Sequence, residues 1–160
     1  MKKLLVTILI LILALGFMFK PSTNEEIIVK IYSDISSDID SVALAKIAEK
    51  VDEYLSELLV DIKDSKSAYK IIKENCDNLQ NIVNSQLKRL NLAHKATIVA
   101  KQLDMPFSNC GDYRLKQGKY NGIEITLGTY LQNSETLVVF PPINNGITRD
   151  FNSRFSGYKN

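Results

Sequence analysis

The chain has 160 residues, of which 45% are hydrophobic and 24% charged, and its formal net charge is +2 at pH 7. This length suits one compact domain plus a targeting segment. The sequence has no basic stripe with interleaved aromatic residues, which argues against a nucleic-acid-binding protein. Lys20–Asn78 carries 8 basic and 13 acidic residues, whereas Leu79–Asn160 carries 10 basic and 5 acidic ones. Ordinary solvated surface explains this asymmetry; the alternatives are that the two halves pair with each other or that they steer a charged partner.

The first twenty residues have the pattern of a targeting segment. Lys2 and Lys3 precede an uncharged apolar run, Leu4–Phe19, which Lys20 ends. A positive start followed by an apolar core is typical of a secretory signal peptide or a membrane anchor. The run would form a helix of about 24 Å, slightly short for a bilayer core of about 30 Å. We expect either a cleaved signal peptide or a retained anchor, with everything after Lys20 exported across the cytoplasmic membrane.

The first half of the domain is predicted to be a strand followed by two helices. Glu26–Ser33 is a β-branched run and predicts the first strand. A turn at Ser36–Ser41 then offers Asp38 and Asp40 as helix N-caps. Apolar residues next recur at steps of three and four in two runs, separated by Asp64–Ser67, which can cap the second helix. The first run is Leu44, Ile47, Ala48, Val51, Leu55, Leu58, Leu59 and Ile62; the second is Ala68, Ile71, Ile72, Cys76, Leu79, Ile82, Val83, Leu87 and Leu90.

The second half changes to strand periodicity. His94–Leu103 approximates an alternating strand, and the Gly- and Pro-punctuated stretch 105–118 is expected to be a loop. Ile123–Tyr130 and Glu135–Phe140 follow, and their short polar connection predicts an antiparallel hairpin. The predicted fold is α+β: a strand, two helices and three antiparallel strands, with the helix pair packed on one sheet.

The expected domain organisation has four parts. Residues 1–20 are the signal peptide or anchor, and residues 21–25 are a linker. Residues 26–143 form the single α+β domain. Residues 144–160 form a polar tail.

Candidate catalytic and metal-binding residues are few. His94 is the single histidine and has no nucleophile motif beside it, which favours a structural role over a general base. Asp34, Asp38 and Asp40 have the rhythm of a calcium loop, but the positions that need Gly and Glu hold other residues, and helix capping explains them better. Cys110 lacks the flanking signature of a thiol enzyme. We therefore expect a protein that binds another protein, with no catalytic residues, no metal and no cofactor.

Two cysteines, Cys76 on a predicted helix and Cys110 in a predicted loop, allow one disulfide in an exported chain. Their spacing leaves open whether they are bonded or free.

A closing motif gives the chain a family likeness. The residues that carry it are Ser36-Ser37-Asp38 after the first strand, Gly118-Lys119-Tyr120, the alternating Ile123, Ile125 and Leu127 with Gly128, and Val138-Val139-Phe140-Pro141-Pro142. In order and spacing they resemble the stage II sporulation protein R family of spore-forming Firmicutes. The family's Trp-Trp-Cys is replaced by Glu135-Thr136-Leu137, and Asn144 stands where the family has its second cysteine. The chain therefore resembles a divergent member.

The resemblance implies a function and a set of contact residues. It implies a signal made in the forespore and exported into the space between the two spore-compartment membranes. There it would activate a membrane-embedded aspartic protease that matures the mother-cell sigma factor. The partner-binding residues expected from the motif are Ser37, Asp38, Tyr120, Gly128, Phe140, Pro141 and Pro142. An envelope-anchored extracytoplasmic binding module is the alternative, and a hydrolase using His94 or Cys110 is the third hypothesis.

Overall fold

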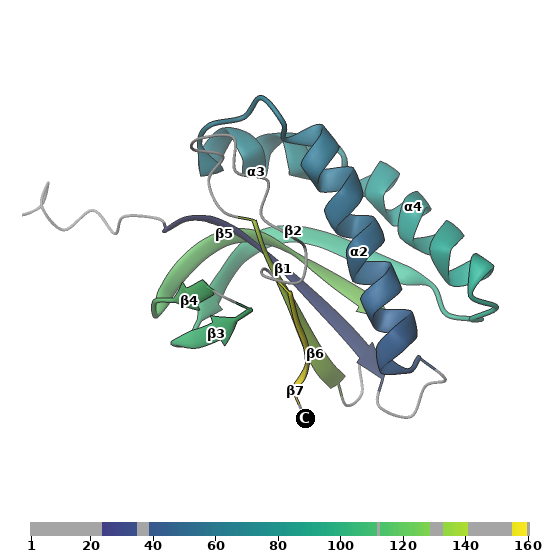
Figure 1. Ribbon diagram of the computed structural model, residues 1–160. Helices are drawn as coiled ribbons and strands as arrows, with labels where there is room; N and C mark the ends of the chain where they lie inside the picture. Colours follow the sequence, from purple (N-terminus) through teal and green to yellow (C-terminus); the bar gives the residue numbers. More distant parts are fainter. Residues whose placement is uncertain (1–23, 35–38, 112, 129–132, 141–154, 160) are drawn as a thin grey trace, which may run out of the picture.

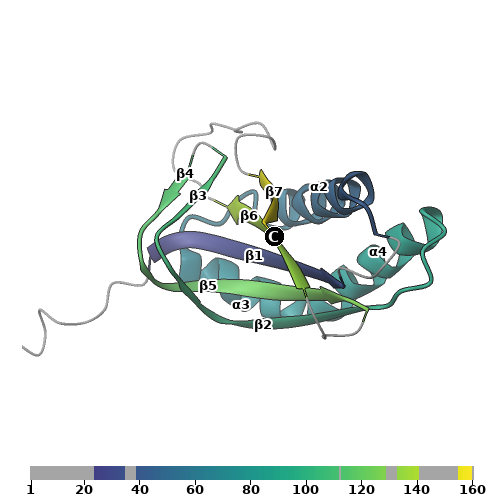
Figure 2. The same cartoon turned by 90° about the horizontal axis from the view of Figure 1, so that it is seen from below.

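A five-stranded sheet carries three helices on one face and a small hairpin on the other, as seen in the computed structural model (Figures 1 and 2). The structure describes residues 24–34, 39–111, 113–128, 133–140 and 155–159. In chain order the elements are β1 (Asn24–Asp34), α2 (Ser41–Leu58), α3 (Ser65–Glu74), α4 (Cys76–Arg89), β2 (Ala96–Met105), β3 (Ser108–Cys110), β4 (Tyr113–Leu115), β5 (Gly118–Leu127), β6 (Asn133–Phe140) and β7 (Phe155–Lys159). The α+β class is therefore confirmed, while the expected N-terminal helix lies outside the described residues.

The order of strands in the sheet is β2-β5-β1-β6-β7. β1 pairs with β5 in parallel and with β6 in antiparallel orientation, so it separates the two strands that were expected to form a hairpin. The predicted β5–β6 hairpin and the purely antiparallel sheet are therefore wrong. The reason lies in β1, whose Ile27, Ile28 and Val29 are at most 3% exposed on both faces. A strand that is apolar on both faces belongs in the centre of a sheet, and this preference outweighs a short connection.

Strand boundaries differ from the predicted ones at two places. β5 begins at Gly118, so Gly118-Lys119-Tyr120 belongs to a strand and not to the loop expected at 105–118. The same stretch contains the β3–β4 hairpin, which places Cys110 in a strand. β7 lies within residues 144–160 and pairs with β6, so the sheet continues past residue 143.

The first helix forms as its apolar stripe predicts. Leu44, Ile47, Val51 and Leu55 are each at most 1% exposed and face the sheet. Asp40 is the N-cap, and its carboxylate accepts a hydrogen bond from the backbone N–H of Ala43 at 2.7 Å. The capping role expected for Asp40 is confirmed, whereas Asp38 lies outside the described residues.

The second predicted helix is two helices, α3 and α4, which meet at Asn75. The Asn75 side-chain amide donates to the carbonyl oxygen of Ile71 at 2.9 Å, and its backbone N–H donates to that of Ile72 at 3.0 Å. Short polar side chains compete with helical hydrogen bonds in this way. Asn75 thus ends α3 without interrupting the apolar stripe, which is why periodicity alone missed the break.

Each face of the sheet has its own apolar core. The helix face carries the larger one, in which Val29, Ile31, Ile123 and Ile125 pack under the three helices. On the opposite face a second core lies under the β3–β4 hairpin (Figure 2). Its buried members are Ile28, Leu103, Met105, Cys110, Leu115 and Tyr120. Successive side chains of β1 point to opposite faces of the sheet and therefore contribute to both cores.

Cys76 and Cys110 are not joined in a disulfide and lie against different cores. Among the described residues, no helix is long and apolar enough to cross a membrane.

Candidate functional site

The seven residues expected to bind a partner fall into three groups. Tyr120 and Gly128 are fully described, and Phe140 is described as the last residue of β6. The others lie outside the described residues; they are Ser37, Asp38, Pro141 and Pro142. Partner contact by any of the seven stays a prediction.

Tyr120 is buried in the second core, with 1% of its surface exposed. Its hydroxyl donates a hydrogen bond to the carbonyl oxygen of Lys116 at 2.9 Å. Burial, together with the charge of Glu26, raises the pKa of the Tyr120 hydroxyl above its ordinary value. The motif tyrosine therefore holds the connection between β4 and β5 from inside the second core. Its side chain is buried and is not available for contact with a partner.

Gly128 ends β5 in a left-handed conformation, with φ of 86°. Its backbone N–H donates to the carbonyl oxygen of Lys95 at 3.0 Å, and a Cβ at this position would lie 3.0 Å from His94 Nδ1. A side chain would meet both backbone strain and the imidazole ring. Gly128 is thus required where β5 leaves the sheet next to the start of β2.

The motif residues mark opposite ends of the sheet. Tyr120 is opposite Asn24 and Phe140 is opposite Ile27, both near the start of β1. Gly128 follows the pair formed by Ser33 and Leu127 at the other end of β1. About eight residues of strand, roughly 26 Å at about 3.3 Å per residue, separate Tyr120 from Gly128. One compact site cannot contain both.

The candidate catalytic residues are also far apart. His94 precedes the first residue of β2, whereas Cys110 packs with Met105 at the last residue of β2, roughly 30 Å along the strand. A histidine activates a thiol only within hydrogen-bonding distance. Within the described part of the chain no group of three or more His, Cys, Asp or Glu residues could hold a metal ion.

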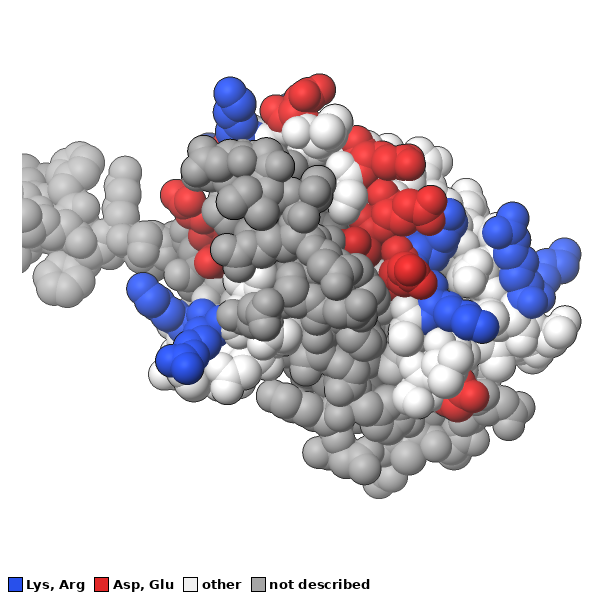
Figure 3. All heavy atoms as spheres, in the orientation of Figure 1, with Lys and Arg blue, Asp and Glu red and all other residues white. Residues whose placement is uncertain are grey.

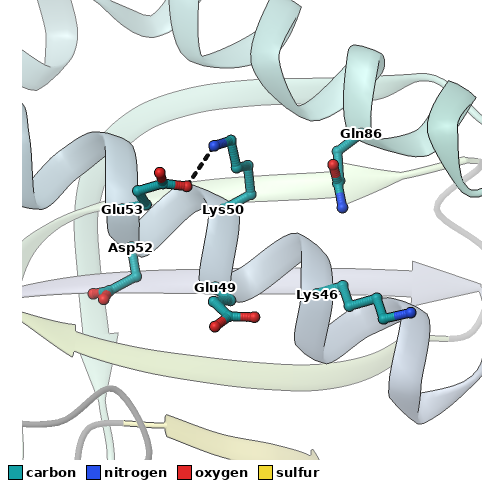
Figure 4. A pocket seen from close by; sticks show the side chains of 6 residues that line it. All are labelled: Lys46, Glu49, Lys50, Asp52, Glu53 and Gln86. Carbon is teal, nitrogen blue, oxygen red and sulfur yellow. Dashed lines mark hydrogen bonds and ion pairs between the residues drawn. The ribbon is translucent and has the colours of Figure 1, made fainter.

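A shallow, open depression of about 480 Å³ is lined by residues of α2 and by Gln86 of α4 (Figure 4). Lys50 and Glu53 form an ion pair in it, one turn apart on the helix. The other side chains point in different directions, and Asp52 among them is buried, with 8% of its surface exposed (Figure 4). The lining residues are Lys46, Glu49, Lys50, Asp52, Glu53 and Gln86. Small-molecule sites are concave and mostly apolar, so we assign no ligand to this depression.

Charges on the described surface gather in two regions visible in Figure 3. Acidic side chains gather over α2, where Glu49, Glu53 and Glu57 are exposed. Basic side chains gather over the β3–β4 region, beside the start of β1. Basic side chains also lie beside the acidic ones on the helix side, where Lys88 and Arg89 end α4, so the two halves of the sequence do not map onto two separate faces of the sheet (Figure 3).

The basic surface is the hairpin rim, which we define as Phe107, Arg114, Lys116 and Lys119. Phe107 is 66% exposed, and the three basic residues are exposed as well. Arg114 and Lys116 alternate with the buried Leu115, so the strand itself turns both charges to solvent. Sequence reasoning missed this rim because it treated 105–118 as a loop; the run Arg114-Leu115-Lys116 was the available signal.

The sheet face beside the hairpin is the other surface that no described element covers. Val99 on β2 is 49% exposed there, and Lys101 forms an ion pair with Glu124 of β5 at 2.6 Å. Mixed polar residues with one exposed valine do not specify a partner.

The comparisons with known proteins bear on the family. A search of the curated proteins and a search of the solved structures each found no match. The family model for stage II sporulation protein R matches residues 23–146, which is more than half of the chain and includes β1 through β6. This chain therefore belongs to the stage II sporulation protein R family.

Proposed function

We propose that this protein is an exported sporulation signal that binds a membrane-embedded aspartic protease and activates it, so that the mother-cell sigma factor matures. The observation that carries the proposal is the family match over residues 23–146. The apolar run after Lys2 and Lys3 supports export, because it has the pattern of a signal peptide or anchor.

Activation would occur by binding, without chemistry by this chain. His94 and Cys110 lie at opposite ends of β2, which does not favour a thiol enzyme. A binding protein activates its partner when it has a higher affinity for the partner's active state. The partner residues proposed from the motif are Ser37, Asp38, Gly128, Phe140, Pro141 and Pro142, with Tyr120 supporting them from the core.

The direct test is deletion of the gene in its own host, followed by immunoblotting of the sigma-factor precursor during sporulation. We expect the precursor to accumulate and the full-length gene to restore processing. Normal processing in the deletion strain contradicts the proposal. Expression during vegetative growth instead of after septation favours an envelope-anchored binding module of another kind.

A finer test compares two acidic residues by restoring the deletion strain with variant genes and measuring sigma-factor processing. Asp38→Asn, in the proposed contact set, should slow sigma-factor processing, whereas Asp61→Asn, on the exposed end of the α2 region, should not. Equal processing by both variants at equal protein levels removes Asp38 from the contact set.

A further inference from the structure

We propose that the hairpin rim is a contact surface for the anionic lipid headgroups of the membrane next to which the exported domain is delivered. The inference rests on the exported orientation in the proposed function, but not on protease activation.

The composition of the rim fits a membrane interface. The hairpin pairs Ser108 with Leu115, so Phe107 and Lys116 are the next residues at its open end. Phe107 is 66% exposed, and unlike Val99 it lies at the same end of the hairpin as a basic side chain, Lys116. Interfacial segments combine an aromatic ring, which enters the headgroup region, with cations that pair with anionic lipids.

The position of the rim places it near the predicted leader. Asn24 is the first residue of β1. It pairs with Tyr120, which follows Lys119 in the chain. Four residue steps separate Lys20 from Asn24, a reach of about 14 Å even when fully extended. The end of the domain that bears the rim is therefore the end closest to the segment expected to meet the membrane.

The charges of the molecule favour one orientation. An anionic surface would attract Arg114, Lys116 and Lys119 and repel the acidic face of α2, which lies on the other side of the sheet (Figures 1 and 3). Asp104, opposite Lys119 in the strand register, is exposed and subtracts one charge from the rim. Glu25 and Glu26, next to Asn24 at the start of β1, also lie near this end of the sheet, so the positive charge is confined to the rim side chains Arg114, Lys116 and Lys119.

The backbone of the rim is held by the family motif. The hydrogen bond from the Tyr120 hydroxyl to the Lys116 carbonyl, at 2.9 Å, fixes the β4–β5 connection between two of the cations. The buried tyrosine of the Gly-x-Tyr motif would thus hold the backbone of the hairpin rim in place, although its own side chain is not part of the rim.

The absence of tryptophan from the chain makes the test simple. Phe107→Trp gives the full chain one fluorophore in the rim. The variant is reconstituted into vesicles of phosphatidylcholine alone or with phosphatidylglycerol. We expect emission to shift to shorter wavelength and brominated lipids to quench it only with phosphatidylglycerol, with the shift lost at high salt. Val60→Trp, at a 64% exposed position after α2, is the matched control and should not shift.

Charge removal gives the quantitative test. Lys116→Gln with Lys119→Gln, made in the Phe107→Trp background, should lower the ratio of docked to undocked fluorophore about fivefold per charge. Lys66→Gln with Lys70→Gln, exposed on α3, should leave the ratio unchanged. Circular dichroism checks that each variant keeps the fold.

Three results overturn the proposal. The first is equal emission of the Phe107→Trp variant in both kinds of vesicle, and the second is an equal shift of the Val60→Trp control. The third is a shift of the Phe107→Trp variant that needs the co-reconstituted protease, which would assign the rim to a protein contact. The main experiment uses vesicles without the protease. A negative result in vesicles therefore does not contradict the sigma-factor test, and normal sigma-factor processing in the deletion strain does not contradict lipid binding.

Discussion

Tyr120 connects the second core to the surface of the hairpin. Its ring packs with Ile28 and Leu103, while its hydroxyl bonds the Lys116 carbonyl. Replacement by phenylalanine keeps the ring and removes the bond, which contributes about 1 kcal/mol to the free energy of unfolding. We expect Tyr120→Phe to lower that free energy by about this amount, measured by urea unfolding of the full chain in mild detergent.

The pH dependence of Tyr120→Phe is a separate prediction. Burial raises the pKa of the Tyr120 hydroxyl, so above pH 10 the unfolded tyrosine loses its proton while the folded one keeps it. The folded state binds more protons there, and stability falls as the pH rises. Below pH 10 both states are protonated and the effect is absent. The variant should lose part of the alkaline destabilisation, and an identical pH profile for both proteins would contradict the assigned burial.

Gly122 lies where β5 and β1 approach each other too closely for a side chain. A Cβ there would lie 2.2 Å from the carbonyl oxygen of Ile28 and 2.8 Å from the Leu103 side chain. The first neighbour is backbone, so β1 itself would have to move. We expect Gly122→Ala to destabilise the protein by about 3 kcal/mol or to prevent folding. Thr97→Ala, on the exposed side of β2, is the control, with an expected change within about 0.5 kcal/mol.

At the scale of elements, α4 covers the free edge of β2. Asn84 accepts from the backbone N–H of Ala96 at 2.8 Å, and Gln80 accepts from that of Ile98 at 3.3 Å. Gln80 and Asn84 are four residues apart on α4, a rise of about 6 Å along the helix. Ile98 and Ala96 are two residues apart on β2, a distance of roughly 6.7 Å. Because these spacings match, side chains on one face of the helix can accept from alternate backbone N–H groups of the strand. Open edges invite pairing with other chains, and α4 blocks this one.

Asn84→Ala tests whether the hydrogen bond from α4 protects the edge of β2. The Ala96 N–H loses its acceptor in a half-buried place, so we expect unfolding to require about 1 kcal/mol less and the full chain to self-associate more readily. Asn81→Ala, on the exposed face of the same helix, should change neither property. Urea unfolding and light scattering provide the two measurements, and equal behaviour of both variants would show that the edge does not depend on this bond.

At the scale of the whole molecule, the sheet keeps the cysteines apart. Cys76 lies beside the larger core under the helices, and Cys110 is buried in the smaller core beneath the hairpin. The fold therefore needs no disulfide, although export would allow one. We expect an alkylating reagent to modify two thiols per denatured chain without prior reduction, as counted by mass spectrometry. In the folded chain Cys76 should react before the fully buried Cys110. A chain with no reactive thiol would contradict this arrangement.

The sequence by itself determined the elements that depend on local periodicity and capping. The stripe of α2, the cap by Asp40 and the apolar run of β1 each contain their own signal, because burial follows the helical or strand period. The family motif was recognisable for the same reason, since Gly118–Leu127 and Val138–Phe140, which belong to it, lie in the strands β5 and β6. Only the tertiary structure decided that β1 enters between β5 and β6, that Asn75 divides α3 from α4, and that Tyr120 points inward while Arg114 and Lys116 form a surface. These outcomes depend on pairing between segments far apart in the chain, and no local pattern encodes which strands a two-faced apolar strand will separate.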